Sequence, residues 1–347
     1  MSRERLRVAI VAGGRSSEHD ISLASARSVL AALDPDRYEV VNVAIERDGR
    51  WALAPAHNPH VLVPGTGSGP AETLPVPAAA GTFETLAGVD VVVPLLHGPF
   101  GEDGTVQGLL ELAGIPYVGA GVAASAVAMD KDLFKKVMRD SGVPVARHLA
   151  LRLGDPVENP FGYPCFVKPA RLGSSVGISK ARSEEELGPA VELARRHDEK
   201  VLVEEFVPGL EIEVAVLGNL EPIASLPGTV ISHLADWYDW ASKYDDGGSE
   251  LIVPPPELDE AQIERAQGLA VSAFTAIDCE GMARVDFFVR EPDGEVVVNE
   301  LNTIPGFTAT SFYARLFAES GIPYERLLDR LIDLALERDE RRRGLVY

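Results

Sequence analysis

The sequence predicts an α/β protein, with a parallel sheet in its first domain and α+β architecture in the rest. Short apolar runs alternate with helical patterns from residue 8 to residue 113, whereas later strand-like runs follow one another in antiparallel order. At 347 residues the chain is also too long for one hydrophobic core, so we expect two or three packed units.

The first unit is predicted to run strand, turn, helix. Residues 8–11 form an apolar strand, and a helical pattern begins near Ser17. Further buried strands are predicted at 39–45 and 89–96, and a helix at 105–113. This alternation is typical of a parallel sheet, which binds ligands at the carboxyl ends of its strands.

A second unit is predicted to begin with a helix at 130–141. Strands follow at 165–168 and 176–180. Ser183 and Glu186 have the spacing of a capping box, which predicts the start of the next helix.

The remaining strands are predicted to be antiparallel, with helices between and after them. The strands lie at 201–206, 211–217, 281–290 and 295–301, and the helices at 259–277, after Phe312 and after Tyr324.

The charge balance disfavours two classes of partner. Lys and Arg total 32 against 53 Asp and Glu, a net charge of −21, so the overall field repels nucleic acid and anionic membranes. No apolar stretch follows the charged N-terminus, and we expect a cytoplasmic protein without a secretory signal. Cys165 and Cys279 are expected to be reduced, packed thiols.

One predicted hairpin groups residues that suit a metal ion. If its turn is centred on Asp293, Asp286 lies opposite Glu300 and Arg284 opposite Asn302, with all four side chains on one face. Two opposed carboxylates favour a cation between them. Carboxylate and amide oxygens suit Mg²⁺ or Mn²⁺ rather than structural zinc. The alternative is a solvated hairpin face without metal.

A glycine-rich segment offers a place for phosphate groups. Lys168 ends a predicted strand, and the small residues of 173–177 follow it. Backbone N–H groups of such a segment can approach an anion closely, and the lysine adds a positive charge. The residue order is not that of a Walker loop, so the alternative is an ordinary hairpin turn.

Four further polar residues are candidates, each with a structural alternative. Glu18 opens the first helix, where a carboxylate also favours the helix dipole. His97 follows the third strand at the same sheet edge, but a loop histidine needs no catalytic role. Lys131 and Lys243 are surface lysines by default, although Lys243 lies in a long segment, 237–248, with the composition of a lid.

Acidic and aromatic residues at two strand ends suit a nucleoside. Glu204, Glu205 and Phe206 end one predicted strand, and Glu211 begins the next. Carboxylates can bond a ribose and a phenyl ring can stack on a base. The alternative is an ordinary strand edge.

These motifs occur together in the order found in one enzyme family. They are Gly13-Gly-x-x-x-Glu18, His97-Gly-x-x-Gly-Glu-Asp-Gly104, Met129-Asp-Lys131, Lys168-Pro, Gly173-Ser-Ser-Val-Gly177, Lys243-Tyr244, Arg284-x-Asp286 and Asn299-Glu-x-Asn302-Thr-x-Pro-Gly306. From about residue 7 to about residue 325, the chain closely resembles D-alanine:D-alanine ligases of the ATP-grasp superfamily.

The resemblance implies an ATP-grasp fold of three domains. A Rossmann-like domain at 1–122 precedes two α+β domains, 123–210 and 211–347, that clasp ATP. It also implies ATP and D-alanine as substrates, two Mg²⁺ or Mn²⁺ ions, a homodimer, and a product used for peptidoglycan precursors. Whether a monovalent cation is also required is left open.

The resemblance also assigns roles to individual residues. Those matching ATP-binding residues are Lys131, Lys168, Glu204, Glu205, Phe206, Val207, Glu211, Lys243 and Phe288. Those matching metal ligands are Asp286, Glu300 and Asn302. Those matching substrate and oxyanion contacts are Glu18, Ser174, Tyr244 and His97 at the first D-alanine, Arg284 and the Gly306 N–H at the oxyanion, and Ser311 and Phe312 at the second D-alanine.

Two other functions are alternatives to dipeptide formation. A ligase that joins D-alanine to D-lactate or D-serine would use the same scaffold, but Lys243-Tyr244 resembles the dipeptide-forming subgroup. A non-catalytic ATP-binding protein should have lost metal ligands or the oxyanion arginine, and all of these residues are present.

Overall fold

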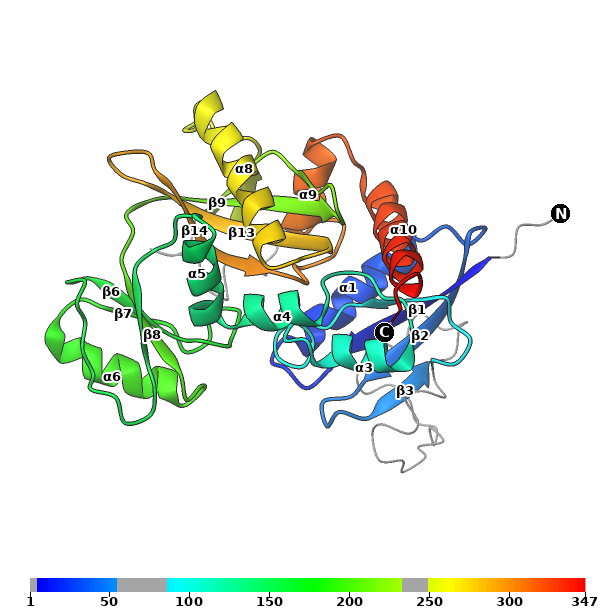
Figure 1. Cartoon of the computed structure of the whole chain (residues 1–347), viewed down its shortest axis with the longest axis horizontal. Helices are drawn as coiled ribbons and strands as arrows, with labels where there is room; N and C mark the ends of the chain where they lie inside the picture. Colours follow the sequence, from blue (N-terminus) through cyan, green and yellow to red (C-terminus); the bar gives the residue numbers. More distant parts are fainter. Residues whose placement is uncertain (1–4, 55–85, 233–248, 347) are drawn as a thin grey trace.

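The computed structural model describes residues 5–54, 86–232 and 249–346. Its strands form a mostly parallel sheet near the N-terminus, then two four-stranded antiparallel sheets and a two-stranded one (Figure 1). The predicted α/β architecture is confirmed. Within these ranges, no helix has both the length and the apolar character needed to cross a membrane.

The first sheet brings the carboxyl ends of two neighbouring parallel strands together. Its order is β3-β2-β1-β4, with β1 parallel to β2 and β4, and β3 antiparallel at the edge. Because the chain passes from one side of β1 to the other, a ligand crevice is expected where β1 ends. Its elements are β1 (Leu6–Gly13), α1 (His19–Ala32), β2 (Tyr38–Ile45), β3 (Trp51–Ala54), β4 (Val91–Pro94) and α3 (Thr105–Ala113).

The second sheet, in the order β5-β8-β6-β7, packs its apolar side chains against α6. Ser183 is the N-cap of α6, but its side chain accepts no bond from the helix. Glu186 instead accepts the N–H of Arg182 at 2.8 Å. The predicted capping box is therefore wrong. The elements are β5 (His148–Leu151), β6 (Cys165–Pro169), β7 (Ser179–Ala181), α6 (Glu184–Arg195) and β8 (Val201–Glu205).

The third sheet, in the order β10-β9-β13-β14, shares a core with helices α4, α5 and α8. The capping box that was not predicted lies at the start of α8, where Asp259 and Gln262 bond each other's backbone N–H groups. The elements are α4 (Val122–Met129), α5 (Lys131–Asp140), β9 (Gly209–Gly218), β10 (Ile223–Ala224), β11 (Thr229–Ser232), β12 (Ser249–Ile252), α8 (Glu260–Ala276), β13 (Gly281–Arg290) and β14 (Val296–Asn302).

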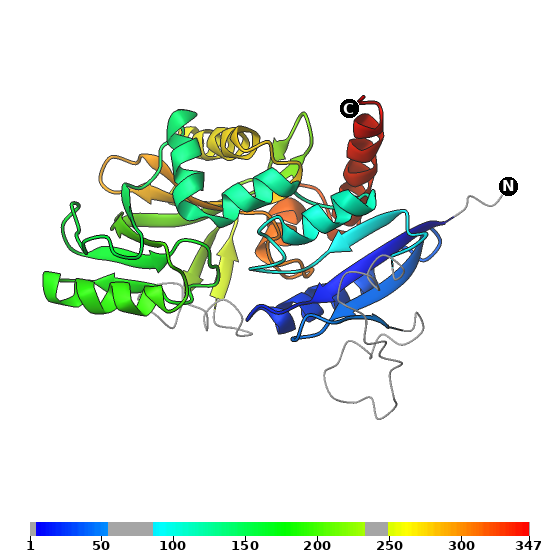
Figure 2. The same ribbon diagram turned by 60° about the horizontal axis from the view of Figure 1, so that its bottom comes forward.

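The C-terminal helices α9 (Phe312–Glu319) and α10 (Tyr324–Arg343) pack back against the start of the chain. Helix α10 contacts β4 and α1 as well as β13 (Figures 1 and 2). The guanidinium of Arg338, 3% exposed, donates to the carbonyls of Tyr117 and Gly119 at 2.6 Å each. One core therefore joins the first sheet to the third.

We predict that Arg338→Met lowers the free energy of unfolding by about 2–4 kcal/mol, because two buried carbonyls lose a charged donor. Urea denaturation followed by circular dichroism measures the change. The control is Arg330→Met on the same helix, which removes a half-exposed ion pair with Glu337 and should cost less than about 1 kcal/mol. Equal effects for the two variants would contradict the prediction.

Candidate active site

The metal hairpin has the predicted register at its functional residues. In the β13–β14 ladder, Arg284 pairs with Asn302 and Asp286 with Glu300. Since side chains alternate along a strand, these four lie on one face of the sheet. The sequence prediction of this grouping is confirmed.

A β-bulge that was not predicted makes this register possible. Towards the turn, Val289 pairs with Val296, which centres the turn between Pro292 and Asp293 rather than on Asp293. The ladder then shifts by one residue after Asp286, and Asn299 is the extra residue on β14. Such bulges redirect side chains and occur often beside active sites.

Each hairpin carboxylate is paired with a cation from the chain itself. Arg284 binds Asp286 through two bonds of 2.7 Å, and the Asn302 amide donates to Asp286 at 3.0 Å. The ammonium of Lys131 lies 3.1 Å from Glu300. Although burial opposes it, Glu300 raises the pKa of Lys131. The cation expected between the carboxylates is thus supplied here by side chains.

The donor set of the hairpin still fits a hard divalent metal. Asp286, Glu300 and Asn302 offer only oxygen ligands from one face. Among the described residues, no group of three or more His, Cys, Asp and Glu side chains forms a further candidate metal site.

A buried ion cluster lies next to the hairpin. Glu204 accepts the ammonium of Lys168 at 2.7 Å and that of Lys135 at 3.0 Å. Burial alone would raise the pKa of Glu204, but the two lysines lower it to about 2. Lys135 also donates to the carbonyl of the bulged Asn299 at 2.9 Å, and Lys168 lies 3.4 Å from its amide oxygen.

Sequence reasoning missed Lys135 and Asn299 as site residues. Lys135 is completely buried and lies one turn after Lys131 on α5, so helical spacing from a proposed phosphate ligand could have indicated it. Asn299 stood within a recognised motif, but nothing in the sequence marked it as a bulge.

The glycine-rich segment contacts the first unit through one short hydrogen bond. Ser174 donates to Glu18 at 2.5 Å. Ser174 and Ser175 have φ angles of 56° and 58°, in the left-handed region that non-glycine residues seldom adopt. Gly98 approaches Glu18 so closely that a Cβ would lie 2.5 Å from its carboxylate.

The buried His97 connects α1 to the segment after β14. Its Nδ1 bonds the carbonyl of Ile304 at 2.8 Å, and its Nε2 lies 3.2 Å from the hydroxyl of Ser25. Because a carbonyl only accepts, Nδ1 carries a proton and Nε2 accepts from Ser25. Burial lowers the pKa of His97 despite the nearby Glu18 carboxylate.

Glu102, which was not among the predicted site residues, links its own loop, after β4, to the segment after β14. Its carboxylate accepts the N–H groups of Gly98 at 2.7 Å and Ile304 at 2.9 Å. Burial, together with the charge of Glu18, raises the pKa of Glu102 to about 8. Glu102 lies within the motif from His97 to Gly104, and this position could have indicated it as a site residue.

Aromatic side chains lie on β6 and β13 and just after the end of β8. The rings of Phe166 and Phe206 lie 6.1 Å apart, and the ammonium of Lys180 lies 4.0 Å from the Phe206 ring centre. Val207 and Phe288 pack in a small apolar cluster nearby. Of these residues, Phe166 and Phe288 line the pocket described below, whereas Phe206 and Val207 are not among its lining residues. An aromatic ring is a surface on which a planar base can stack.

Two acidic residues predicted around the nucleoside differ in their surroundings. The Glu205 side chain is held by Arg147, whose backbone N–H and Nε donate to it at 2.8 and 2.6 Å. Glu211 is exposed at the pocket wall. Of the two carboxylates, Glu211 is therefore the better placed to meet a ligand.

The segment after β14 contains the remaining predicted residues. The Ser311 hydroxyl accepts the N–H of Thr308 at 3.0 Å, and Gly306 lies beside it, where a Cβ would be 3.4 Å from that hydroxyl. Phe312 begins α9 and packs partly on the core. Lys243, Tyr244 and the proposed lid lie outside the described residues.

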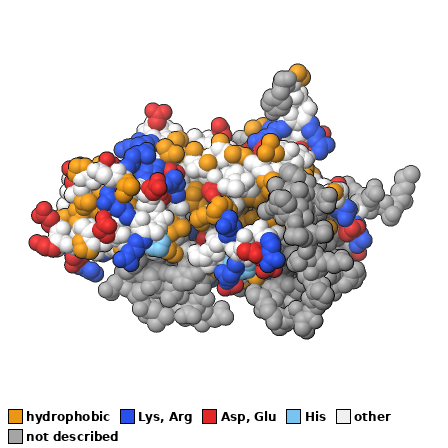
Figure 3. All heavy atoms as spheres, turned by 90° about the horizontal axis from the view of Figure 1, so that it is seen from below, with side chains coloured by type: hydrophobic (Ala, Val, Ile, Leu, Met, Phe, Trp, Pro, Cys, Tyr) orange, Lys and Arg blue, Asp and Glu red, His pale blue; other side chains and the backbone are white. Residues whose placement is uncertain are grey.

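Most of the predicted nucleotide and metal residues meet in one pocket between the second and third sheets. Its lining includes Lys131, Lys168, Ser174, Glu204, Glu211, Asp286, Phe288, Asn299 and Glu300. In the view from below, basic and acidic side chains intermingle on the described part of the surface (Figure 3). Two lysines, the carboxylates of the β13–β14 hairpin and aromatic side chains thus share one cavity.

Two antiparallel sheets that clasp such a pocket define an ATP-grasp enzyme. A family model described as the D-ala D-ala ligase N-terminus matches residues 7–120, and one described as its C-terminus matches residues 137–333. The chain belongs to the D-alanine–D-alanine ligase family.

Known relatives agree with this assignment. The D-alanine–D-alanine ligase of Mycolicibacterium gilvum is 49% identical, over 96% of this chain and 98% of its own. The structure of the D-alanine-D-alanine ligase from Coxiella burnetii is similar with a TM-score of 0.84 and 38% identity, covering 98% of this chain and 97% of that chain. The VanG D-Ala:D-Ser ligase from Enterococcus faecalis has a TM-score of 0.84 and 34% identity, covering 96% and 100%.

We predict that Glu204→Gln lowers the free energy of unfolding at neutral pH by about 3 kcal/mol. The pKa of Glu204 is about 2 in the folded protein and 4.5 in the reference state, so its contribution exists above pH 4.5 and disappears as the pH falls towards 2. Urea unfolding of both proteins should show the difference shrinking over that interval. The control, Glu192→Gln at a mostly exposed carboxylate, should show little difference at any pH.

Proposed function

We propose that this chain joins two D-alanine molecules into D-alanyl-D-alanine, converts ATP to ADP and phosphate, and thereby supplies peptidoglycan precursor synthesis. Family membership and the identity of its relatives support the reaction. The observation that carries it is the convergence of Lys131, Lys168 and the acidic β13–β14 hairpin in one pocket.

The reaction needs activation, because a free carboxylate is a poor electrophile. The first D-alanine carboxylate attacks the γ-phosphorus of ATP, and ADP leaves. The amine of the second D-alanine then attacks the carbonyl of the acyl phosphate, loses a proton, and expels inorganic phosphate as the peptide bond forms. Both steps bring anions together, so the site must supply positive charge.

The lysines of the pocket are suited to bind the phosphates of ATP. Lys131 and Lys168 both line the cavity and are held by carboxylates that fix their ammonium groups. We assign them to the α- and β-phosphates. Lys243 is assigned a place near the γ-phosphate from the sequence alone.

Glu18 is the group we assign to the ammonium of the first D-alanine. It is bonded to Ser174, so its carboxylate is already oriented. His97 lies beside it with its ring held at both nitrogens. Tyr244, which the sequence adds to this group, lies outside the described residues.

Arg284 and the Gly306 N–H are assigned to the tetrahedral oxyanion of the second step. Arg284 is held by Asp286 and, at 3.3 Å, by Glu213, so its guanidinium is oriented before substrate arrives. A donor that needs no reorientation stabilises the transition state more than the ground state. Ser311 and Phe312, at the start of α9, are assigned to the carboxylate of the second D-alanine.

The divalent metal is assigned to Asp286, Glu300 and Asn302. The two carboxylates oppose each other in register and the amide lies on the same face, which fits Mg²⁺ or Mn²⁺. When bound, such ions offset the negative charge of ATP and of the phosphoryl group in transfer.

The base and ribose are assigned to the apolar end of the pocket. Phe206 and Phe288 offer ring surfaces and Val207 an apolar contact, while Glu211 is placed to bond the ribose. Glu205 has its side chain bonded to Arg147, so we assign its contribution to the backbone. Glu204 is assigned the role of holding the ammonium of Lys168, which we assign to a phosphate.

Three broader assignments accompany the reaction. We divide the chain into domains at 1–122, 123–210 and 211–347 from the family resemblance. We place the enzyme in the cytoplasm, where ATP is available, and we propose a homodimer from the family resemblance.

A D-alanyl-D-serine or D-alanyl-D-lactate ligase is the second candidate. Its support is the similarity to a D-Ala:D-Ser ligase structure at 34% identity. The 49% identity to a D-alanine–D-alanine ligase and the Lys243-Tyr244 pair favour dipeptide formation.

We predict that D-alanine alone supports full ATP turnover at neutral pH. D-lactate or D-serine added to D-alanine should increase ADP release little, because the Lys243-Tyr244 pair resembles the dipeptide-forming subgroup. A coupled ADP-release assay with product identification by mass spectrometry measures this. Preferential synthesis of D-alanyl-D-lactate or D-alanyl-D-serine would overturn the assignment to dipeptide formation.

We also predict that Arg284→Ala folds and binds ATP but ligates about 100- to 1,000-fold more slowly, the usual effect of removing an oxyanion donor. Turnover and ATP affinity are measured separately, by ADP release and calorimetry. Arg284→Lys keeps the positive charge but loses the two-bond contact with Asp286. Its turnover should therefore lie between that of the unchanged enzyme and that of Arg284→Ala. Near-normal turnover of Arg284→Ala would refute the role.

A further inference from the structure

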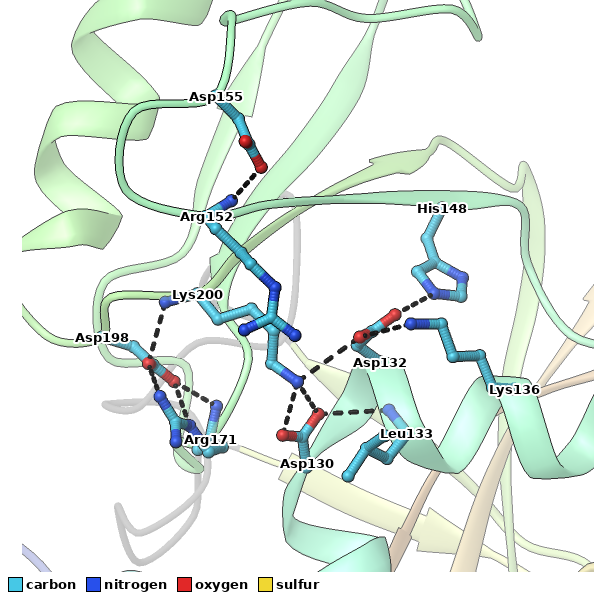
Figure 4. Close-up of polar contacts among 10 residues, drawn as sticks. All are labelled: Asp130, Asp132, Leu133, Lys136, His148, Arg152, Asp155, Arg171, Asp198 and Lys200. Atoms are coloured by element: carbon cyan, nitrogen blue, oxygen red, sulfur yellow. Dashed lines mark hydrogen bonds and ion pairs between the residues drawn. The ribbon is translucent and has the colours of Figure 1, made fainter.

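A buried charge cluster lies outside the pocket, beside its lysine-bearing helix. The ammonium of Lys200, a residue that is 6% exposed, is 2.6 Å from both carboxylate oxygens of Asp130 and 3.4 Å from Asp132 (Figure 4). Asp132 is also bonded to Lys136 at 2.9 Å and lies 3.2 Å from His148. Among the described residues, Lys200 is the only cation in an ion pair with Asp130.

Three chain segments meet at Lys200. Asp130 caps helix α5 by accepting the N–H of Leu133 at 3.1 Å. The N–H of Lys131 donates to the carbonyl of Ala170 at 2.9 Å, and the N–H of Ala170 donates to the carbonyl of Lys200 at 2.9 Å. Lys200 therefore holds the start of α5 with its side chain and the end of β6 with its backbone.

Lys131 is the pocket residue that this arrangement controls most directly. It follows Asp130 in the chain, and its ammonium contacts Glu300 at 3.1 Å and the Leu172 carbonyl at 2.9 Å. Both contacts are short enough that a displaced helix start would break them. Without Lys200, the buried Asp130 and Asp132 carboxylates would repel each other at this helix start.

We propose that Lys200 is a positioning residue for ATP binding. By clamping Asp130 at the first turn of α5, it fixes the direction of Lys131, although Lys200 itself does not line the pocket. The inference rests on the proposed role of Lys131 as a phosphate ligand. It adds a residue on a different segment, after α6, to the machinery that orients the nucleotide.

Lys136 provides a matched control. It is bonded to Asp132, as Lys200 is, but its side chain is 52% exposed, and within the described part of the chain its one ion pair is with Asp132. Removing either lysine takes one positive charge from the same cluster. Only the removal of Lys200 releases the helix cap, so only that variant should affect the nucleotide.

The test compares steady-state ADP release by the full chain carrying Lys200→Met or Lys136→Met. Lys200→Met should raise the KM for ATP about tenfold or more, the scale of effect of a displaced binding group. The KM for D-alanine and kcat at saturating ATP should change less than about twofold. Lys136→Met should leave all three unchanged.

Two further variants test whether Lys200 acts through Asp130 and Lys131. Asp130→Asn retains an N-cap residue but loses the charge that Lys200 holds, so it should also raise the KM for ATP, and it serves if Lys200→Met does not fold. The double variant Lys131→Met, Lys200→Met should match Lys131→Met alone within about twofold, because Lys200 acts through Lys131.

The opposite results separate this inference from the proposed function. If Lys131→Met raises the KM for ATP but Lys200→Met and Asp130→Asn do not, the positioning role is wrong. An equal loss for Lys136→Met, or full additivity in the double variant, also overturns it. If Lys131→Met itself has a normal KM for ATP, the phosphate-binding role of Lys131 fails instead.

Discussion

The site depends on the buried ion cluster in which Glu204 holds Lys168 and Lys135. An unpaired charge in the interior costs several kcal/mol, and burial does lower the pKa of Lys135. The Glu204 carboxylate lies 2.7 and 3.0 Å from the two ammonium groups, so one negative charge is shared by two positive ones. Because β6, β8 and α5 each contribute one member, the cluster joins the second sheet to the helix that carries Lys131. The positive side chains of the pocket are therefore fixed before any ligand binds.

The same pairing recurs on the β13–β14 hairpin and explains how an acidic protein can hold an anionic nucleotide. Asp286 is matched by Arg284 and Glu300 by Lys131. A net charge of −21 describes the far field, which salt screens within about 10 Å. The pocket lining has more carboxylates than cations, since Lys131 and Lys168 stand against Glu204, Glu211, Glu213, Asp286 and Glu300. This excess of oxygen ligands suits divalent cations, which in turn offset the charge of a nucleotide. The acidity that disfavours nucleic acid is therefore compatible with nucleotide chemistry.

Local patterns predicted much of the fold and part of the site, and the failures have physical causes. The helix at 105–113 and the strand at 281–290 depend on local periodicity and were predicted at their observed bounds. The pairing of Asp286 with Glu300 was predicted from a turn centred on Asp293, but it arises from a different turn centre and a bulge. Tertiary contacts decide such a bulge, since the carbonyl of Asn299 is bonded to Lys135 on another element.

The arrangement of the C-terminus follows from the need to keep distant segments of the site in register. Glu18, His97 and Glu102 come from the first unit, yet His97 and Glu102 are bonded to Ile304, just after β14. These bonds can keep their short distances only if the first sheet is held in a fixed position against the third. Helix α10 does this by packing on both and by using Arg338 to hold the chain where it leaves the first unit. No periodicity in the sequence encodes that contact, because it depends on which surface a helix faces rather than on whether it forms.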